Sequence, residues 1–271
     1  MSNAVAEVKK TEMSVELMDD IFDSAGEGTT FSADEMQMPR IKLLQKMSPE
    51  IDKKDAKYIQ DASSGDMAND VTKEFWDGEK GMTIVPVYQT TSYTEFTPKE
   101  QGGGYIGTVN SSDPRLSQTE RNGSVETFRD NGNELVKSDD NYCLIVAEDG
   151  SYSPALIGMK STSLKVSRRW KTQIALQSVK HPKTGKQVKP ALFATMWKLG
   201  SVEESRDGNT WSIYTIEKIG LVNSRDLLQE AKTLRESIAS GQVKATPENN
   251  SSQVSGSGLS SVVDDAGDIP F

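Results

Sequence analysis

Two segments in which apolar and polar side chains alternate constrain the fold of this chain more than any other feature. Residues 191–202 and 211–222 alternate apolar and polar side chains, the pattern of β-strands that lie partly in a core. Arg206-Asp207-Gly208-Asn209 joins them. We therefore expect two long, consecutive strands.

Shorter strand-like runs come earlier in the chain. β-rich runs are predicted at 82–88 and 92–96, and at 141–147 and 153–159 around a turn at 148–152. The intervening residues 99–140 are polar and rich in Gly, Asn, Ser and Asp, which indicates a hairpin or loop excursion outside the core.

Two helices are predicted from apolar spacing. Residues 161–179 place Val166, Trp170 and Ile174 on one stripe, so Trp170 is expected in the core. A second amphipathic helix ends near Gly241. Its apolar stripe consists of Leu227, Leu228, Ala231, Leu234 and Ile238.

The predicted order of elements indicates a mainly β, α+β protein. It fits an elaborated OB-fold-like antiparallel barrel with an inserted helix and a C-terminal helix, flanked by disordered acidic ends. We divide the chain into an acidic mobile arm (1–31), a body (32–240), a flexible linker (241–263) and an acidic tip (264–271). A capping box of Ser32 and Glu35 favours a helix start at the body's beginning.

Charge is distributed very unevenly along the chain. The net charge is −9, but residues 1–36 carry −7 and residues 247–271 carry −4, which leaves +2 for residues 37–246. Residues 150–202 contain ten Lys or Arg and no Asp or Glu. Such a local positive field suits a polyanion, and the alternative is an ordinary solvated face. The ten candidate phosphate-binding residues are Lys160, Lys165, Arg168, Arg169, Lys171, Lys180, Lys183, Lys186, Lys189 and Lys198.

Aromatic side chains on the 191–202 segment are candidates for stacking on unpaired bases. Alternation puts Phe193 and Trp197 on one face, opposite a face of Leu192, Ala194 and Met196 that suits a core. The alternative is a central strand with both faces buried. Tyr214 and Lys218 on the following strand are further candidates for DNA contact.

The sequence offers no constellation for catalysis, so no enzyme activity, metal or cofactor is expected. His181 and Cys143 are the only residues of their kinds, which excludes a Cys/His zinc site and an intrachain disulfide. Gly102-Gly103-Gly104 lacks the Lys-Ser/Thr of a phosphate loop. No apolar run has membrane-spanning length and no signal peptide is visible, so a cytoplasmic protein is expected.

The last eight residues form an acidic tip that ends in Ile269-Pro270-Phe271. Asp264, Asp265 and Asp268 supply its acids, and Ala266-Gly267 interrupts them. This tip resembles that of bacterial single-stranded DNA-binding proteins. A terminal Phe presents a ring and a carboxylate together, which a partner can hold in an apolar pocket beside Arg or Lys. The alternative is a solvated acidic end.

The order of acidic arm, β-rich body, polar linker and acidic tip is similar to that of single-stranded DNA-binding proteins of tailed bacteriophages. The resemblance implies sequence-independent coating and protection of single strands in replication, recombination or repair, in the bacterial host cytoplasm. It also implies docking of a primase, helicase, polymerase subunit or nuclease on the tip. A strand-annealing recombination protein and a non-DNA protein that captures host repair enzymes remain alternatives. Oligomers are possible, and the sequence does not give their size.

Overall fold

The structure is a computed structural model that describes residues 14–24, 27–28, 37–122 and 125–243. Two compact units divide the chain, residues 1–36 and residues 37–271. The predicted tip, nearly all of the predicted linker and the capping box of Ser32 and Glu35 lie outside the described residues.

The described residues of the first unit include one helix, α1 (Val15–Asp23). The hydroxyl of Ser14 caps it by accepting a hydrogen bond from Leu17 N at 3.2 Å. Leu17, Ile21 and Phe22 are exposed along the helix. Local capping and amphipathic spacing therefore favour a helix without help from a core.

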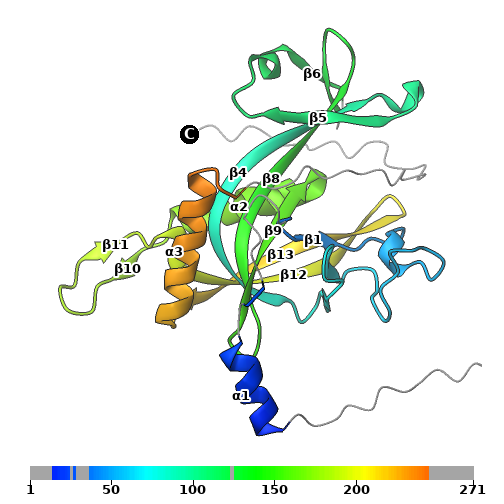
Figure 1. Ribbon diagram of the computed structural model, residues 1–271. Coiled ribbons are helices and arrows are strands. Elements are labelled where there is room, and N and C mark those ends of the chain that lie inside the picture. Colours follow the sequence, from blue (N-terminus) through cyan, green and yellow to red (C-terminus); the bar gives the residue numbers. More distant parts are fainter. Residues whose placement is uncertain (1–13, 25–26, 29–36, 123–124, 244–271) are drawn as a thin grey trace, which may run out of the picture. The chain divides into compact units, whose positions relative to one another are not determined.

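The second unit is mainly β, as predicted, with one inserted and one C-terminal helix (Figure 1). The helices are α2 (Leu164–Ala175) and α3 (Arg225–Ala239). The strands are β1 (Arg40–Leu43), β2 (Met67–Asn69), β3 (Phe75–Trp76), β4 (Met82–Thr97), β5 (Gly104–Asn110), β6 (Thr119–Asn122), β7 (Val125–Phe128), β8 (Glu134–Val146), β9 (Tyr152–Lys160), β10 (Val179–Lys180), β11 (Gln187–Val188), β12 (Thr195–Arg206) and β13 (Asn209–Leu221).

One curled sheet forms a half-barrel with the strand order β13-β12-β4-β8-β9-β1-β2-β3. Its pairings are antiparallel except for β1 and β9, which run parallel where Ile41 lies opposite Ile157. The sheet is therefore mixed. The turn between β12 and β13 has positive φ at Asp207 (51°) and Gly208 (80°), the geometry of a tight hairpin.

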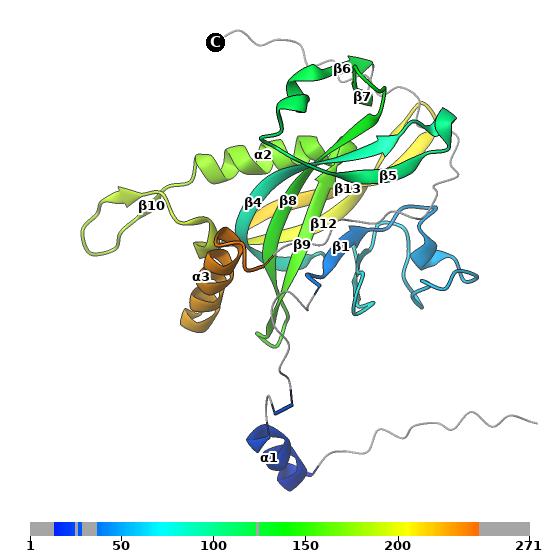
Figure 2. The ribbon, with the colours of Figure 1, turned by 45° about the horizontal axis from the view of Figure 1, so that its top comes forward.

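Both faces of the sheet carry apolar side chains, and a helix packs on each face (Figure 2). α2 packs on the inner face and α3 packs on the outer face. On the inner face, Trp170 of α2 meets Trp197 of β12 with ring centroids 5.8 Å apart in a T-shaped arrangement. On the outer face, Leu227 and Ala231 of α3 pack against Val85 and Leu144. The prediction that Trp170 belongs to the core is confirmed.

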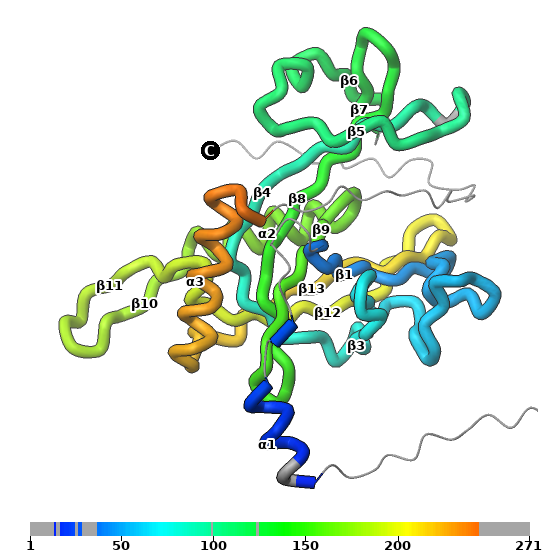
Figure 3. The backbone as a smooth tube through the Cα atoms, viewed as in Figure 1, coloured from blue at the N-terminus to red at the C-terminus, as the bar shows by residue number. Residues whose placement is uncertain are grey.

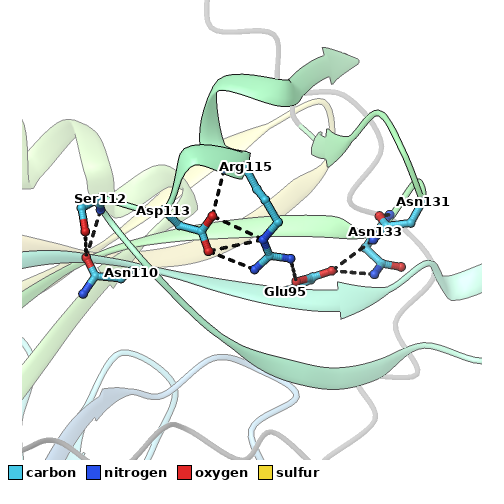
Figure 4. A network of polar contacts seen from close by, with 7 residues as sticks. All are labelled: Glu95, Asn110, Ser112, Asp113, Arg115, Asn131 and Asn133. Carbon is cyan, nitrogen blue, oxygen red and sulfur yellow. Dashed lines mark hydrogen bonds and ion pairs between the residues drawn. The ribbon is translucent and has the colours of Figure 1, made fainter.

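The predicted hairpin or loop excursion is built of hairpins. Beyond the barrel, β4 and β8 continue side by side and carry β5, β6 and β7 (Figure 3). Glu95 is 5% exposed and is held by Arg115 at 3.2 Å and by Asn133 at 2.6 Å (Figure 4). The polar residues of this excursion supply the partners of a buried carboxylate.

Candidate nucleic-acid interface

The acid-free basic segment folds into β9, α2, the β10–β11 hairpin and the first part of β12. α2 lies against the half-barrel, and the hairpin that follows it extends away from the sheet (Figures 1 and 2). The predicted helix over 161–179 is shorter than expected. It begins with a 3-10 turn at Ser161–Ser163, becomes α-helical at Leu164 and ends at Ala175.

A buried carboxylate anchors α2 to the sheet. Asp139 of β8 is 3% exposed and accepts hydrogen bonds from Ser167 Oγ at 2.6 Å and Thr91 Oγ1 at 2.9 Å. Lys171 Nζ lies 2.8 Å from the same carboxylate. Burial alone would raise the pKa of Asp139, but the contacts of Lys171, Ser167 and Thr91 outweigh it and lower that pKa. Lys171 therefore helps to hold α2 on the sheet.

A second predicted DNA-binding lysine is also engaged. Lys165 Nζ lies 2.7 Å from both carboxylate oxygens of Glu204 on β12. Glu204 lies two residues beyond the acid-free segment and 39 residues from Lys165, so the sequence did not show the pairing. Arg168 and Arg169 are both exposed on α2. The helix thus offers two neighbouring guanidinium groups to solvent.

Three further predicted DNA-binding residues, Lys198, Lys218 and Lys160, lie on strands of the sheet. Lys198 is exposed and lies opposite Glu217 in the β12–β13 ladder, whereas Lys218 lies opposite Trp197 on the other face. Lys160, at the end of β9, is half-buried. These three residues therefore do not form one continuous patch with each other.

The hairpin carries the other four predicted cations. Lys180, Lys183, Lys186 and Lys189 are all exposed, and none has an ion-pair partner among the residues that the structure describes. Figure 2 shows this hairpin projecting beyond the end of α2. Together with Arg168 and Arg169 it forms what we call the basic arm.

The predicted stacking residues are placed differently. Trp197 is 0% exposed and its Nε1 donates to Thr195 Oγ1 at 2.9 Å, so the assignment of Trp197 to a solvent face is wrong. Tyr214 is 4% exposed and donates to Ile41 O at 3.2 Å. Phe193 lies in a 3-10 turn and packs partly buried against the α3 side. The alternative of a strand with both faces covered is what the structure shows.

The assignment of Trp197 to a solvent face failed partly because β12 begins later than expected. β12 starts at Thr195, not at residue 191, and a bulge follows between Met196 and Trp197. Met196 faces the α3 side while Trp197 faces the α2 side. Periodicity separates two faces but does not say that helices cover both.

Sequence reasoning missed the buried polar residues of β8. Next to Asp139, Asp140 accepts from Ser92 Oγ at 2.5 Å and Ser138 Oγ at 2.6 Å, and Asn141 is fully buried. The available signal was the run Ser138-Asp139-Asp140-Asn141 directly before an apolar strand. That run was assigned to the excursion and to the edge of a strand.

Three further features of the described residues bear on their chemistry: the single cysteine, metal-binding groups and membrane-spanning helices. Cys143 is buried as a free thiol, and burial raises its pKa. Within the described ranges, no three His, Cys, Asp or Glu side chains gather as a metal-binding group would. None of the helices in the described part of the chain is both long and apolar enough to cross a membrane.

Comparison with known proteins identifies one family. A family model described as Pam3 phage gp34-like protein matches residues 8–244. The match includes α1, the half-barrel and the whole basic arm, and it ends before the acidic tip. No curated protein and no solved structure matches the chain.

Proposed function

We propose that this chain, which belongs to the Pam3 phage gp34-like protein family, binds single-stranded DNA without sequence preference and protects it during phage DNA replication or recombination. The observation that carries the proposal is the basic arm. An acidic protein of net charge −9 keeps 53 consecutive residues free of Asp and Glu, and the six cations of the basic arm are all exposed.

The mode of binding follows from which groups are accessible. Arg and Lys side chains neutralise phosphates, and this contact carries no sequence information. Trp197 and Tyr214 are buried and are not available to stack on bases. We therefore propose that phosphate contacts dominate binding to single strands, with a strong dependence on salt.

The test measures binding of a labelled oligo-dT by fluorescence anisotropy at two salt concentrations. The change is the double substitution Arg168→Gln and Arg169→Gln, with Lys53→Gln and Lys54→Gln as a control that removes two exposed charges elsewhere. The arginine variant is expected to bind more weakly, with a log–log salt slope reduced by about 1.4, or roughly 0.7 per phosphate contact.

Two outcomes would contradict the proposal. No binding of oligo-dT at low salt would remove single-strand binding altogether. Equal losses in the arginine variant and the control would show that only overall charge matters. Rapid annealing of complementary strands by the protein would instead favour the alternative of a recombination annealing protein.

The tip supplies the second part of the proposal. Asp264, Asp265, Asp268, Ile269, Pro270 and Phe271 lie outside the described residues, so this part rests on their sequence and its resemblance to the tips of single-stranded DNA-binding proteins. We propose that they recruit a host or phage replication or repair protein. Deleting residues 269–271 is expected to abolish binding to purified primase, helicase, polymerase or nuclease candidates while leaving oligo-dT affinity unchanged.

A further inference from the structure

The β10–β11 hairpin stands apart from the core of the protein. Its strands have two residues each, and every residue from His181 to Lys189 is exposed. A two-stranded hairpin of this size is marginally stable by itself and buries little apolar surface. Its presence therefore calls for a role other than stabilising the fold.

The turn of the hairpin is organised by the only histidine. His181 Nδ1 accepts hydrogen bonds from the backbone N–H groups of Lys183 and Thr184, both at 3.2 Å. His181 N donates to Lys186 O at 2.8 Å, and Gly185 takes the positive φ of 69° that closes the turn. These contacts hold the hairpin as a ribbon, with Lys183 at the turn.

The ribbon carries positive charge on both faces. Lys180 lies opposite Gln187 on one face, and Val179 lies opposite Val188 on the other. Strand alternation adds Lys189 to the first face and Lys186 to the second. The ribbon therefore differs from a one-sided basic patch that lies flat on a surface.

The hairpin also lacks the groups that favour unpaired bases. Residues 178–190 contain no Phe, Tyr or Trp, and stacking on such rings is a main source of affinity for single strands. A two-stranded ribbon fits the major groove of a duplex, whose two walls are rows of phosphates. Cations on both faces can contact both walls at once.

We propose that the β10–β11 hairpin is a duplex-binding ribbon that seats in a groove of double-stranded DNA. The ligand of the complete basic arm is then a junction, where α2 contacts the single strand and the hairpin contacts the adjoining duplex. The contact of α2 with the single strand rests on the proposed function, whereas the contact of the hairpin with the duplex does not.

The first experiment compares three DNA probes, which are an oligo-dT, a blunt duplex and the same duplex with that oligo-dT as a tail. The variant replaces Lys180, Lys183, Lys186 and Lys189 with Gln. The control replaces four exposed lysines elsewhere, Lys53, Lys54, Lys80 and Lys232, with Gln. Circular dichroism checks that all three proteins are folded.

The wild type and the control are expected to bind the tailed duplex about tenfold more tightly than oligo-dT. The hairpin variant is expected to lose that preference, because its affinity for the tailed duplex falls about tenfold further than its affinity for oligo-dT. A hairpin variant that loses oligo-dT binding as strongly as tailed-duplex binding would overturn the assignment. Loss of oligo-dT binding by the wild type, with duplex binding retained, would overturn only the proposed function.

A second experiment locates the hairpin on the DNA. Lys183→Cys introduces a reactive thiol at the turn, while Cys143 is buried and does not compete for labelling. An iron chelate attached there is expected to cleave the duplex part of the tailed probe within a few base pairs of the junction. Cleavage confined to the oligo-dT tail would overturn the assignment.

Discussion

The side-chain amide of Gln45 bonds to the backbone of Ser212 as a residue of a neighbouring strand would. Gln45 Nε2 donates to Ser212 O at 3.0 Å, and Ser212 N donates to Gln45 Oε1 at 2.9 Å. β13 is the last strand of the sheet, and Ser212 belongs to its outer edge. One side chain that follows β1 thus links that segment to the β13 end of the half-barrel and satisfies part of an open strand edge.

Gln45→Ala is expected to destabilise the protein by about 1–3 kcal/mol, because both backbone groups of Ser212 lose their partner. Urea unfolding followed by circular dichroism measures the change. Gln60→Ala, at an exposed position, is the matched control and should change stability by less than about 0.5 kcal/mol. Equal stability of the two variants would show that the Gln45 link contributes nothing.

Asp139→Asn is expected to destabilise the protein at neutral pH by about 1–3 kcal/mol, because charge-assisted contacts with Lys171 and Ser167 are weakened. The pKa of Asp139 is lowered on folding, so its contribution is complete above the ordinary value of about 3.9 and is lost as pH falls through the folded-state pKa below it. The stability difference between wild type and variant should therefore shrink near pH 3. A difference that is the same at pH 7 and pH 3 would contradict this account.

Trp197→Ala is expected to lower stability by about 3–5 kcal/mol, because it empties the site against Trp170. Oligo-dT affinity per folded molecule should stay the same, since the ring is 0% exposed. Tyr152→Ala, at a ring that is 39% exposed on β9, is the control for stability. A stable Trp197→Ala protein that fails to bind oligo-dT would restore the stacking role.

Gly78→Ala is expected to distort the seam between β12 and the segment before β4. A Cβ at Gly78 would lie 2.1 Å from Gly65 O, and Gly78 O accepts the backbone hydrogen bond of Ser201 at 2.8 Å. Neither backbone can move without breaking contacts, so a loss of about 1–3 kcal/mol or more is expected. Gly220→Ala has open space around its Cβ and should be tolerated in the same thermal unfolding assay.

Local patterns predicted several elements well. The runs at 141–147 and 153–159 became parts of β8 and β9, and the stripe that ends at Ile238 became α3. These predictions hold because periodicity and capping act over a few residues. The parallel pairing of β1 with β9 could not be predicted, since it depends on contacts between residues more than a hundred positions apart.

The sequence by itself determined the mainly β class with its inserted and C-terminal helices, the core position of Trp170 and the acid-free segment that supplies the basic arm. Only the tertiary structure decided which of its cations remain available. Lys165 and Lys171 are drawn to Glu204 and Asp139 because folding brings distant strands beneath α2. It also decided that Trp197 is buried, because α2 packs on the face of β12 that carries this ring.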